Sequence, residues 1–289
     1  MKFVAVSDTH IVPKGQPSRG LDTAERLRLA LADLAENHSD AEFCVMCGDL
    51  ADHGDPAAYD HFAEIIDGFP IPLKIMIGNH DHRENFRTAF PRMPVDGNGF
   101  VQSVHVSEHG HFIFCDSYEA GRVDGRMCER RLAWLDDRLT DAGRAGVGAC
   151  VFFHHPPYRT GGRIDALRLT DHAAVGEVLS AHDHVRHIFA GHTHRIASGT
   201  WRGIPFATFG ATHYNNGLPL VGPAGHLRRF VSPAYSTVVL VDDEQIVVHA
   251  NEFLNDNPEV DAAHFDHEKI DALIAAGGDI SAIRDTAAG

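Results

Sequence analysis

Five short clusters of Asp, Asn and His could carry chemistry in this chain. They are SDTH at 7–10, GDLADHGD at 48–55, GNHDHR at 78–83, FFHHPP at 152–157 and AGHTH at 190–194. Imidazole nitrogens combined with carboxylate and amide oxygens, without thiolates, suit Mn, Fe, Zn or Co better than a structural cysteine-rich zinc site. The clusters therefore predict a transition-metal centre built from distant parts of the chain.

The spacing within the clusters suggests how ligands could be paired. Asp8 and His10 are two residues apart, as are His192 and His194, and in an extended segment such residues point to the same side. On a strand the adjacent His154 and His155 would point to opposite sides, so only one of them is expected to be a ligand. Seven candidates are too many for one tetrahedral ion, so two ions sharing the two oxygens of Asp49 are expected. The candidates are Asp8, His10, Asp49, Asn79, His154, His192 and His194.

The elements that must position these residues alternate between strands and helices. Apolar runs predict strands at 2–7, 42–48, 72–77, 149–153 and 185–190, hairpin strands at 100–106 and 110–116, and further strands within 195–210 and 236–250. Helical patterns cover 22–37, 56–67, 83–90, 128–142 and 165–183. All but one of the clusters follow a predicted strand directly, which is where α/β sheets build their sites. Alternation of this kind predicts helices packed on both faces of a largely β layer.

The five motifs together resemble the calcineurin-like metallophosphoesterase superfamily. D-x-H, G-D, G-N-H-D, a lone H and G-H-x-H occur in that order between residues 8 and 194. The resemblance implies an α/β fold, a four-layer sandwich of α+β type with two mixed β-sheets flanked by helices. It also implies that one metal takes Asp8, His10, Asp49 and His194, and the other takes Asp49, Asn79, His154 and His192. It favours His154 over His155.

A narrower resemblance concerns GDLADHGDPAAY (48–59) and GNHDHR (78–83). Both are similar to the bacterial branch that holds class III cyclic-nucleotide phosphodiesterases and glycerophosphodiesterases. Members of that branch carry a cap and a C-terminal extension that help them dimerise. By position and length, 210–234 is the expected cap or oligomer contact within a catalytic domain at 1–250, and 251–289 is the expected extension. A homo-oligomer formed through these parts is one expectation.

The resemblance implies hydrolysis of a phosphate ester. Two divalent ions would supply a bridging hydroxide that attacks phosphorus in line and would neutralise the phosphoryl oxygens. The charges of two ions, Asp8 and Asp49 are balanced by one hydroxide and one diester monoanion. Together with the resemblance to the bacterial branch, which implies small phosphodiester substrates, this favours 3′,5′- or 2′,3′-cyclic nucleotides or glycerophosphodiesters. A phosphomonoesterase or phosphoprotein phosphatase is the alternative within the enzyme class, and a catalytically silent scaffold is the alternative outside it.

Two residues of the third motif are expected to act beside the metals. His80 resembles the family histidine that faces the substrate oxygen, where it would stabilise the transition state or protonate the leaving group. Asp81 could orient a histidine by accepting a ring proton. Expected substrate contacts come from the motifs and from the ATHYNN segment at 211–216: Asn79, His80, His53, His213 and Tyr214.

Composition narrows the partners. The chain of 289 residues has 25 Lys and Arg against 40 Asp and Glu, a net charge of −15, which argues against a nucleic-acid polymer or an anionic membrane as partner. Five scattered cysteines predict no disulfide framework, and Cys44 and Cys47 fall within a predicted buried strand. Without a signal-peptide pattern or a run of about 20 apolar residues, the expected compartment is the cytoplasm.

Overall fold

The computed structural model describes residues 1–218 and 228–258, together with residues 272 and 275. The chain divides into two compact units, Met1–Asn255 and Asp256–Gly289. The centre of the expected cap and most of the expected C-terminal extension lie outside the described residues. Within the described part, no helix is both long enough and apolar enough to cross a membrane.

The first sheet has the strand order β13-β12-β1-β2-β3. Three parallel strands form its N-terminal half: β1 (Lys2–Val6), β2 (Cys44–Cys47) and β3 (Leu73–Met76). Two strands from the other end of the unit complete it, β12 (Ala234–Val241) and β13 (Ile246–Leu254). Strand β12 runs antiparallel to both β1 and β13, so the sheet is mixed.

The second sheet has the order β4-β5-β6-β7-β9-β8 and is also mixed. Its strands are β4 (Ser103–Ser107), β5 (Gly110–Phe114), β6 (Ala149–Phe153), β7 (Val185–Ala190), β8 (Ala197–Trp201) and β9 (Ile204–Thr208). The pairs β5–β6, β6–β7 and β7–β9 are parallel, whereas β4–β5 and β8–β9 are antiparallel. A two-stranded ribbon, β10 (Asn215–Asn216) and β11 (Arg229–Phe230), lies outside both sheets.

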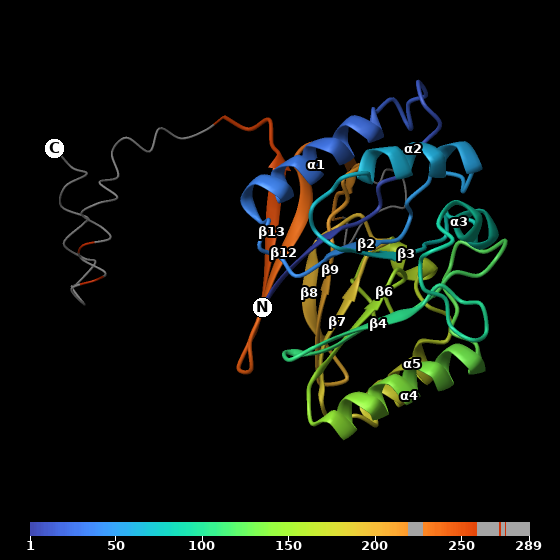
Figure 1. The fold of residues 1–289 in the computed structure, drawn as a ribbon, viewed down its shortest axis with the longest axis vertical. Helices are drawn as coiled ribbons and strands as arrows, with labels where there is room; N and C mark the ends of the chain where they lie inside the picture. Colours follow the sequence, from blue (N-terminus) through green and yellow to red (C-terminus); the bar gives the residue numbers. More distant parts are fainter. Residues whose placement is uncertain (219–227, 259–271, 273–274, 276–289) are drawn as a thin grey trace. The chain divides into compact units, whose positions relative to one another are not determined.

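Helices cover the outer face of each sheet, which gives the expected four layers (Figure 1). Helices α1 (Thr23–Asn37) and α2 (Pro56–Ile66) lie on one side, followed by the short α3 (Arg83–Ala89). On the opposite side lie α4 (Glu129–Ala145) and α5 (His172–Ser180). The α/β sandwich of two mixed sheets flanked by helices is thus confirmed.

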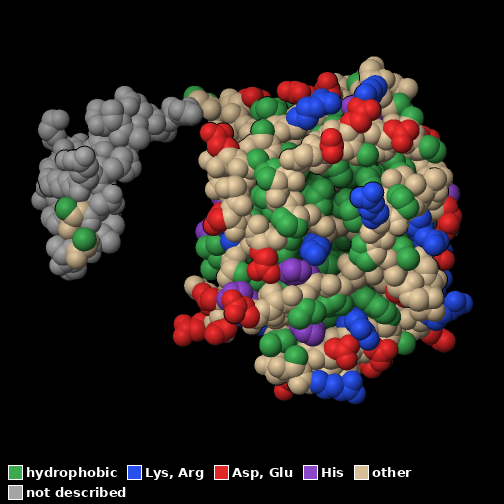
Figure 2. All heavy atoms as spheres, viewed as in Figure 1, with side chains coloured by type: hydrophobic (Ala, Val, Ile, Leu, Met, Phe, Trp, Pro, Cys, Tyr) green, Lys and Arg blue, Asp and Glu red, His purple; other side chains and the backbone are tan. Residues whose placement is uncertain are grey.

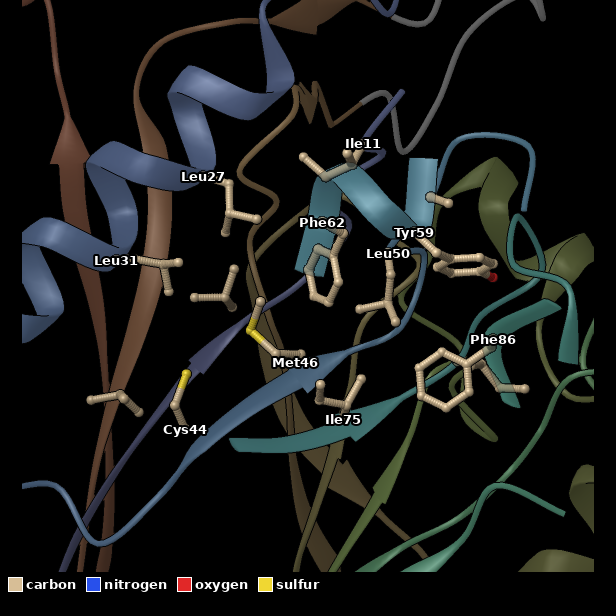
Figure 3. Close-up of a cluster of buried hydrophobic side chains, with 14 of the residues drawn as sticks. Ile11, Leu27, Leu31, Cys44, Met46, Leu50, Tyr59, Phe62, Ile75 and Phe86 are labelled. Atoms are coloured by element: carbon tan, nitrogen blue, oxygen red, sulfur yellow. The ribbon is translucent and has the colours of Figure 1, made fainter. Parts of the chain in front are cut away.

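Three apolar clusters fill the spaces between these layers. In β1, Val4 and Val6 face the cluster under α1 and α2, whereas Phe3 and Ala5 face the cluster between the two sheets. Alternate strand residues point to opposite faces, so one short apolar strand contributes to two cores. Figure 3 shows the first cluster, where Leu27 and Leu31 of α1 approach Met46 of β2. A third cluster packs α4 and α5 onto the second sheet.

One predicted helix is interrupted in the structure. The segment 165–183 contains a 3₁₀ turn at Arg163–Leu167 and then α5, with a break between them. In the break, the backbone N–H of Leu169 donates to Pro156 O and that of Thr170 donates to Gly125 O. These amides bond to distant segments instead of continuing the helical ladder, so the single helix expected from periodicity is wrong.

Candidate metal centre

The seven ligand candidates come together where strands of both sheets end. Asp8 and His10 follow β1, Asp49 follows β2 and Asn79 follows β3, all in the first sheet. His154 follows β6, and His192 and His194 follow β7, in the second sheet. The parallel strands of each sheet end at a common edge, so the two sheets contribute ligands to one place.

The backbone at this place is left-handed rather than extended. Positive φ angles occur at Asp8 (54°), His10 (47°), Asp49 (49°), His192 (65°) and His194 (48°). The expectation that extended i, i+2 spacing aligns the pairs is therefore wrong, because turned backbone brings them together. Left-handed backbone costs non-glycine residues roughly 1–2 kcal/mol each, and such strain persists where the surroundings fix it and clusters at functional sites. Here His10 N donates to Asp49 O at 3.0 Å.

Four candidates form one compact group. Nitrogen and oxygen atoms of Asp8, His10, Asp49 and His194 all lie within 4.8 Å of one another, and all four side chains are buried. His10 Nε2 faces His194 Nε2 at 3.1 Å, and Asp8 Oδ1 is 3.3 Å from His194 Nε2. Asp8 Oδ1 is buried without a hydrogen-bond partner among the described residues. Facing imidazole nitrogens beside an unpartnered carboxylate oxygen are the donor set of a cation site.

The remaining candidates lie on the other side of Asp49. Asp49 Oδ2 is 3.3 Å from His154 Nε2 and 3.7 Å from His10 Nε2, so this one oxygen stands between the two groups. In the described part of the chain, His154 Nε2, His192 Nε2 and Asn79 Oδ1 are buried with no hydrogen-bond partner. Unpartnered buried polar atoms are costly unless something binds them. The residues present therefore fit two cations that share Asp49.

Three of the histidines are held by their far nitrogens. His10 Nδ1 is 3.0 Å from Asp52 Oδ1, His154 Nδ1 is 2.7 Å from the carbonyl of Cys47, and His194 Nδ1 is 2.8 Å from the carbonyl of Tyr214. A proton on Nδ1 donates to each of these oxygens and leaves the Nε2 lone pair facing the centre. Such partners fix both the ring orientation and the tautomer of a metal-binding histidine.

Electrostatics divides the histidines into two kinds. Burial lowers the pKa of His154, but the neighbouring Asp49 carboxylate outweighs it and raises this pKa to about 9. Burial and the adjacent imidazoles lower the pKa of His192 to about 3, and burial lowers that of His194 to about 4. His192 and His194 are thus neutral at neutral pH, the form that binds a cation. Binding at His154 must displace a proton.

Asp52 was not among the sequence candidates, although it lies in the GDLAD motif. Its second carboxylate oxygen accepts from Ser18 Oγ at 2.8 Å, and its carbonyl accepts from His80 Nδ1 at 2.7 Å. Burial raises the pKa of Asp52, but the hydrogen bonds from His10 and Ser18 outweigh it and hold this pKa below its usual range. Asp52 therefore links a ligand candidate to His80 through one buried side chain.

The carboxylate of Asp81 binds loop amides and a tyrosine instead of the histidine ring that was expected. Its carboxylate accepts from the backbone N–H groups of Leu50, Ala51 and Gly78 and from the hydroxyl of Tyr59, at 2.8–3.1 Å. Burial and the charge of Asp49 raise its pKa to about 6. Asp81 thus joins the loop that carries Asp49 to the loop that carries Asn79, instead of accepting a proton from a histidine ring.

The strand alternation that was expected to separate His154 from His155 is absent, and the choice of His154 as the ligand stays a prediction. Strand β6 ends at Phe153, so the strand alternation does not extend to His154 and His155. The ring of His155 lies 4.7 Å from that of His192 and its Nδ1 is 2.8 Å from Ser117 Oγ. Burial and the neighbouring histidines hold the pKa of His155 well below its usual range, so its ring is neutral. Its Nε2 is buried without a hydrogen-bond partner among the described residues.

The residues expected to contact substrate differ in exposure and in their distance from the ligand candidates. His80 is partly exposed, its ring is 4.6 Å from that of His10, and its backbone N–H donates to Asp49 Oδ1. His53 is 72% exposed and its Nε2 is 3.6 Å from Asp52. His213 is buried, with its ring 4.8 Å from that of His10. Tyr214 stacks on His194 with ring centres 4.4 Å apart.

The comparisons with known proteins agree with this geometry. The family model of the calcineurin-like phosphoesterases matches residues 1–195. A probable cyclic nucleotide phosphodiesterase from Rhodopseudomonas palustris is 40% identical over 89% of this chain and 94% of its own length. The 3′,5′-cyclic adenosine monophosphate phosphodiesterase CpdA of Escherichia coli is 27% identical over 70% of this chain and 73% of its own.

Two further relatives extend the comparison. A probable glycerophosphodiester phosphodiesterase GpdQ from Arcobacter nitrofigilis is 27% identical over 76% of this chain and 81% of its own length. A crystal structure of a dimetal phosphatase from Danio rerio shares the fold, with a TM-score of 0.68 at 15% identity over 88% of this chain and 97% of its own. With its motifs, its sandwich and these relatives, the chain belongs to the calcineurin-like phosphoesterase family, in the branch of the bacterial cyclic nucleotide and glycerophosphodiester phosphodiesterases.

Proposed function

We propose that this chain hydrolyses small phosphodiesters, cyclic nucleotides or glycerophosphodiesters, with two divalent transition-metal ions held by the seven candidate residues. The observation that carries the proposal is the position of Asp49 Oδ2 between two groups of buried ligand atoms that lack other partners. The nitrogen and oxygen donor set suits Mn, Fe, Zn or Co. The names of the relatives support a diester substrate.

The chain's own residues supply orientation and protons. Two bound divalent ions would activate a water molecule and neutralise charge on the phosphoryl oxygens. Cys47 O, Tyr214 O and Asp52 aim the imidazoles at the centre, so little reorganisation is needed when substrate binds. His80 Nδ1 donates to Asp52 O, which leaves Nε2 free to take up a second proton. In the doubly protonated form, His80 would give the Nε2 proton to the departing alkoxide.

Substrate contacts and domain organisation complete the proposal. Five residues are proposed to line the substrate site: Asn79, His80, His53, His213 and Tyr214. Asn79 is itself a ligand candidate, His80 and His213 lie beside His10, and Tyr214 lies beside His194. The exposed His53 is near Asp52. The proposed catalytic domain, 1–250, ends within β13, whose last residue is Leu254. We propose that the cap at 210–234 and the extension at 251–289 serve as oligomer contacts.

The test is hydrolysis of bis(p-nitrophenyl) phosphate against p-nitrophenyl phosphate by purified protein reconstituted with Mn²⁺. A clear preference for the diester, lost in Asp49→Ala, supports the proposal. A preference for the monoester would make the protein a phosphomonoesterase instead. Hydrolysis of neither ester, with fewer than two ions bound per chain, would make it a silent scaffold.

A further inference from the structure

Two arginines flank the tyrosine that stacks on the metal centre. The guanidinium carbon of Arg19 lies 5.7 Å from the centre of the Tyr214 ring, and that of Arg229 lies 5.2 Å from it. The same ring stacks on His194 at 4.4 Å and its residue's carbonyl accepts from His194 Nδ1. Both positive charges therefore lie one stacked ring away from a ligand candidate, within the range of cation–π attraction.

The segment that carries Arg19 is fixed to the metal centre. Ser18 and Leu21 exchange two backbone hydrogen bonds, of 3.0 and 2.8 Å, which close a tight turn with Arg19 and Gly20 at its tip. Arg19 has a φ of 50° and Gly20 a φ of 82°. Ser18 is buried and donates to Asp52, the carboxylate that also binds His10. The turn therefore holds the backbone of Arg19 in a set position at the edge of the site.

The segment that carries Arg229 is fixed to a different ligand candidate, His194. In the β10–β11 ribbon, Arg229 pairs with Asn216, and the N–H of Asn216 donates to the carbonyl of His194 at 2.6 Å. Gly217 N donates to Arg228 O at 2.7 Å, which continues the pairing. Two segments more than 200 residues apart thus bring guanidiniums to one aromatic ring.

Neither arginine has a carboxylate partner among the described residues. No Asp or Glu of the described part forms an ion pair with Arg19 or Arg229, whereas Arg83 and Arg131 both approach the buried Asp116. Acidic residues outnumber basic ones by 40 to 25 in this chain. On the face drawn in Figure 2, Lys and Arg are scattered among Asp and Glu. Both guanidinium carbons lie within 5.7 Å of the same ring centre and neither has a carboxylate partner in the described part. Guanidinium groups bind phosphate oxygens in pairs, so this combination suits an anion.

We infer that Arg19 and Arg229 form a second anion subsite that binds a non-reacting phosphate of the substrate. The inference rests on the proposed function and narrows its substrate class. The preferred diesters carry a second phosphate on the sugar next to the scissile bond, and a cyclic nucleotide with a single phosphate leaves the subsite empty. Only the Tyr214 ring separates the two guanidiniums from His194. This short separation fits two phosphates on the same sugar better than two phosphates on different nucleotides.

The first experiment compares two chromogenic diesters on the Mn²⁺-reconstituted protein, the p-nitrophenyl ester of thymidine 5′-phosphate with and without a 3′-phosphate. The wild type should favour the 3′-phosphorylated ester by about tenfold in kcat/KM, mainly through KM, the effect expected of charge-assisted hydrogen bonds. Arg19→Asn, which keeps a residue that tolerates positive φ, and Arg229→Gln should each reduce the preference, and together they should abolish it. Arg228→Gln, one residue away and stacked on Phe230, should keep it.

A second readout does not depend on turnover. Calorimetry should show thymidine 3′,5′-bisphosphate binding about tenfold more tightly than thymidine 5′-phosphate, with the difference lost in the double variant. Equal binding of both nucleotides, with both esters hydrolysed equally, refutes the subsite and leaves the proposed function standing. Tighter binding of the bisphosphate without hydrolysis of either ester leaves the subsite standing and refutes the function. An equal loss in Arg228→Gln would show a general charge effect and overturn the inference.

Discussion

At the scale of single residues, one buried carboxylate connects several parts of the site. Asp52 accepts from His10 Nδ1 and from Ser18 Oγ, and its carbonyl holds His80. Removing the carboxylate frees the His10 ring and unbinds the turn that presents Arg19. Removal of the Asp52 carboxylate should therefore mainly weaken metal binding, and should affect the rate of hydrolysis only secondarily.

We expect Asp52→Ala to weaken Mn²⁺ binding by about ten- to a hundredfold, the usual effect of losing a partner that orients a metal-binding histidine. Competition with a coloured chelator measures the affinity. Ser18→Ala, which leaves the Asp52–His10 contact in place, should have a smaller effect. Unchanged Mn²⁺ affinity in Asp52→Ala would show that the His10 ring is oriented by other contacts.

The role proposed for His80 predicts a dependence on the leaving group. His80→Ala should lower kcat by about 10²-fold or more for a diester with a poor alkoxide leaving group, the usual contribution of a positioned acid. The loss should be smaller for p-nitrophenoxide, which needs little protonation. A kcat for the poor leaving group equal to that of the wild type would show that His80 does not donate the proton.

Residue types and motif order were enough to predict which Asp and His residues lie together, but not the contacts that orient them. Asp52 and Ser18 are 34 positions apart, and no local pattern relates them. Asp81 was predicted to orient a histidine because it follows His80. Instead its carboxylate accepts from two amides of the loop after β2, from the amide of Gly78 and from the hydroxyl of Tyr59 in α2. Both cases depend on contacts between segments that are distant in sequence, and sequence periodicity carries no information about such contacts.

At the scale of elements, glycine allows the loop after β3 to approach the loop after β2. A Cβ built on Gly78 would lie 2.6 Å from Asp49 N and 2.6 Å from His154 Nε2. Gly97 has nothing within 4 Å of such a Cβ. We expect Gly78→Ala to lower the free energy of unfolding by about 1–3 kcal/mol and to impair Mn²⁺ binding, as overpacking does.

Gly97→Ala is the matched control and should leave both properties unchanged. Urea unfolding of metal-free protein measures the stability, and chelator competition measures Mn²⁺ affinity. If the two alanine variants behaved alike, the close approach of the two loops would not matter to the site.

His187, a histidine in β7 that is not a ligand candidate, should make the free energy of unfolding depend on pH. Burial lowers the pKa of His187 to about 4 in the folded protein, whereas its ordinary value is 6.5. The unfolded chain therefore takes up this proton first, so stability falls as the pH drops from 6.5 towards 4 and is unaffected by this group above 6.5. The loss reaches at most about 3 kcal/mol.

His187→Phe should flatten the fall in unfolding free energy between pH 6.5 and 4, measured by urea titration of metal-free protein. The exposed His249→Gln is the control, and its curve should run parallel to that of the wild type. Parallel curves for His187→Phe and the wild type would mean that His187 is readily protonated in the folded state.

Strands and most helices were predictable because short apolar runs and 3.6-residue periodicity are local signals. The break before α5 was not, because the amides of Leu169 and Thr170 bond to segments that are distant in sequence. The order of strands was equally hidden. Nothing in residues 234–241 indicates that β12 pairs with β1 rather than with the strands that directly precede β12 in the chain.

At the scale of the whole molecule, the metal centre joins the two sheets, so bound ions should stabilise the whole unit. Ligand candidates follow β1, β2 and β3 in the first sheet and β6 and β7 in the second. Mn²⁺ at 100 times its Kd should add about 2.7 kcal/mol of stability, which is several degrees in Tm for a unit of this size. Scanning calorimetry with and without a chelator measures the shift, and Asp49→Ala should show none. Equal Tm values for loaded and chelated wild type would contradict the coupling.

The position of β12 has a consequence for the order of events during synthesis. Strand β1 and Asp8 are synthesised more than 220 residues before β12, the antiparallel neighbour of β1. Until some 240 residues have emerged, one edge of the nascent sheet stays open. Such long-range pairing slows folding. Metal acquisition is therefore expected to follow release of the chain, and a nascent polypeptide halted before residue 234 should bind Mn²⁺ poorly even though it already contains every ligand candidate.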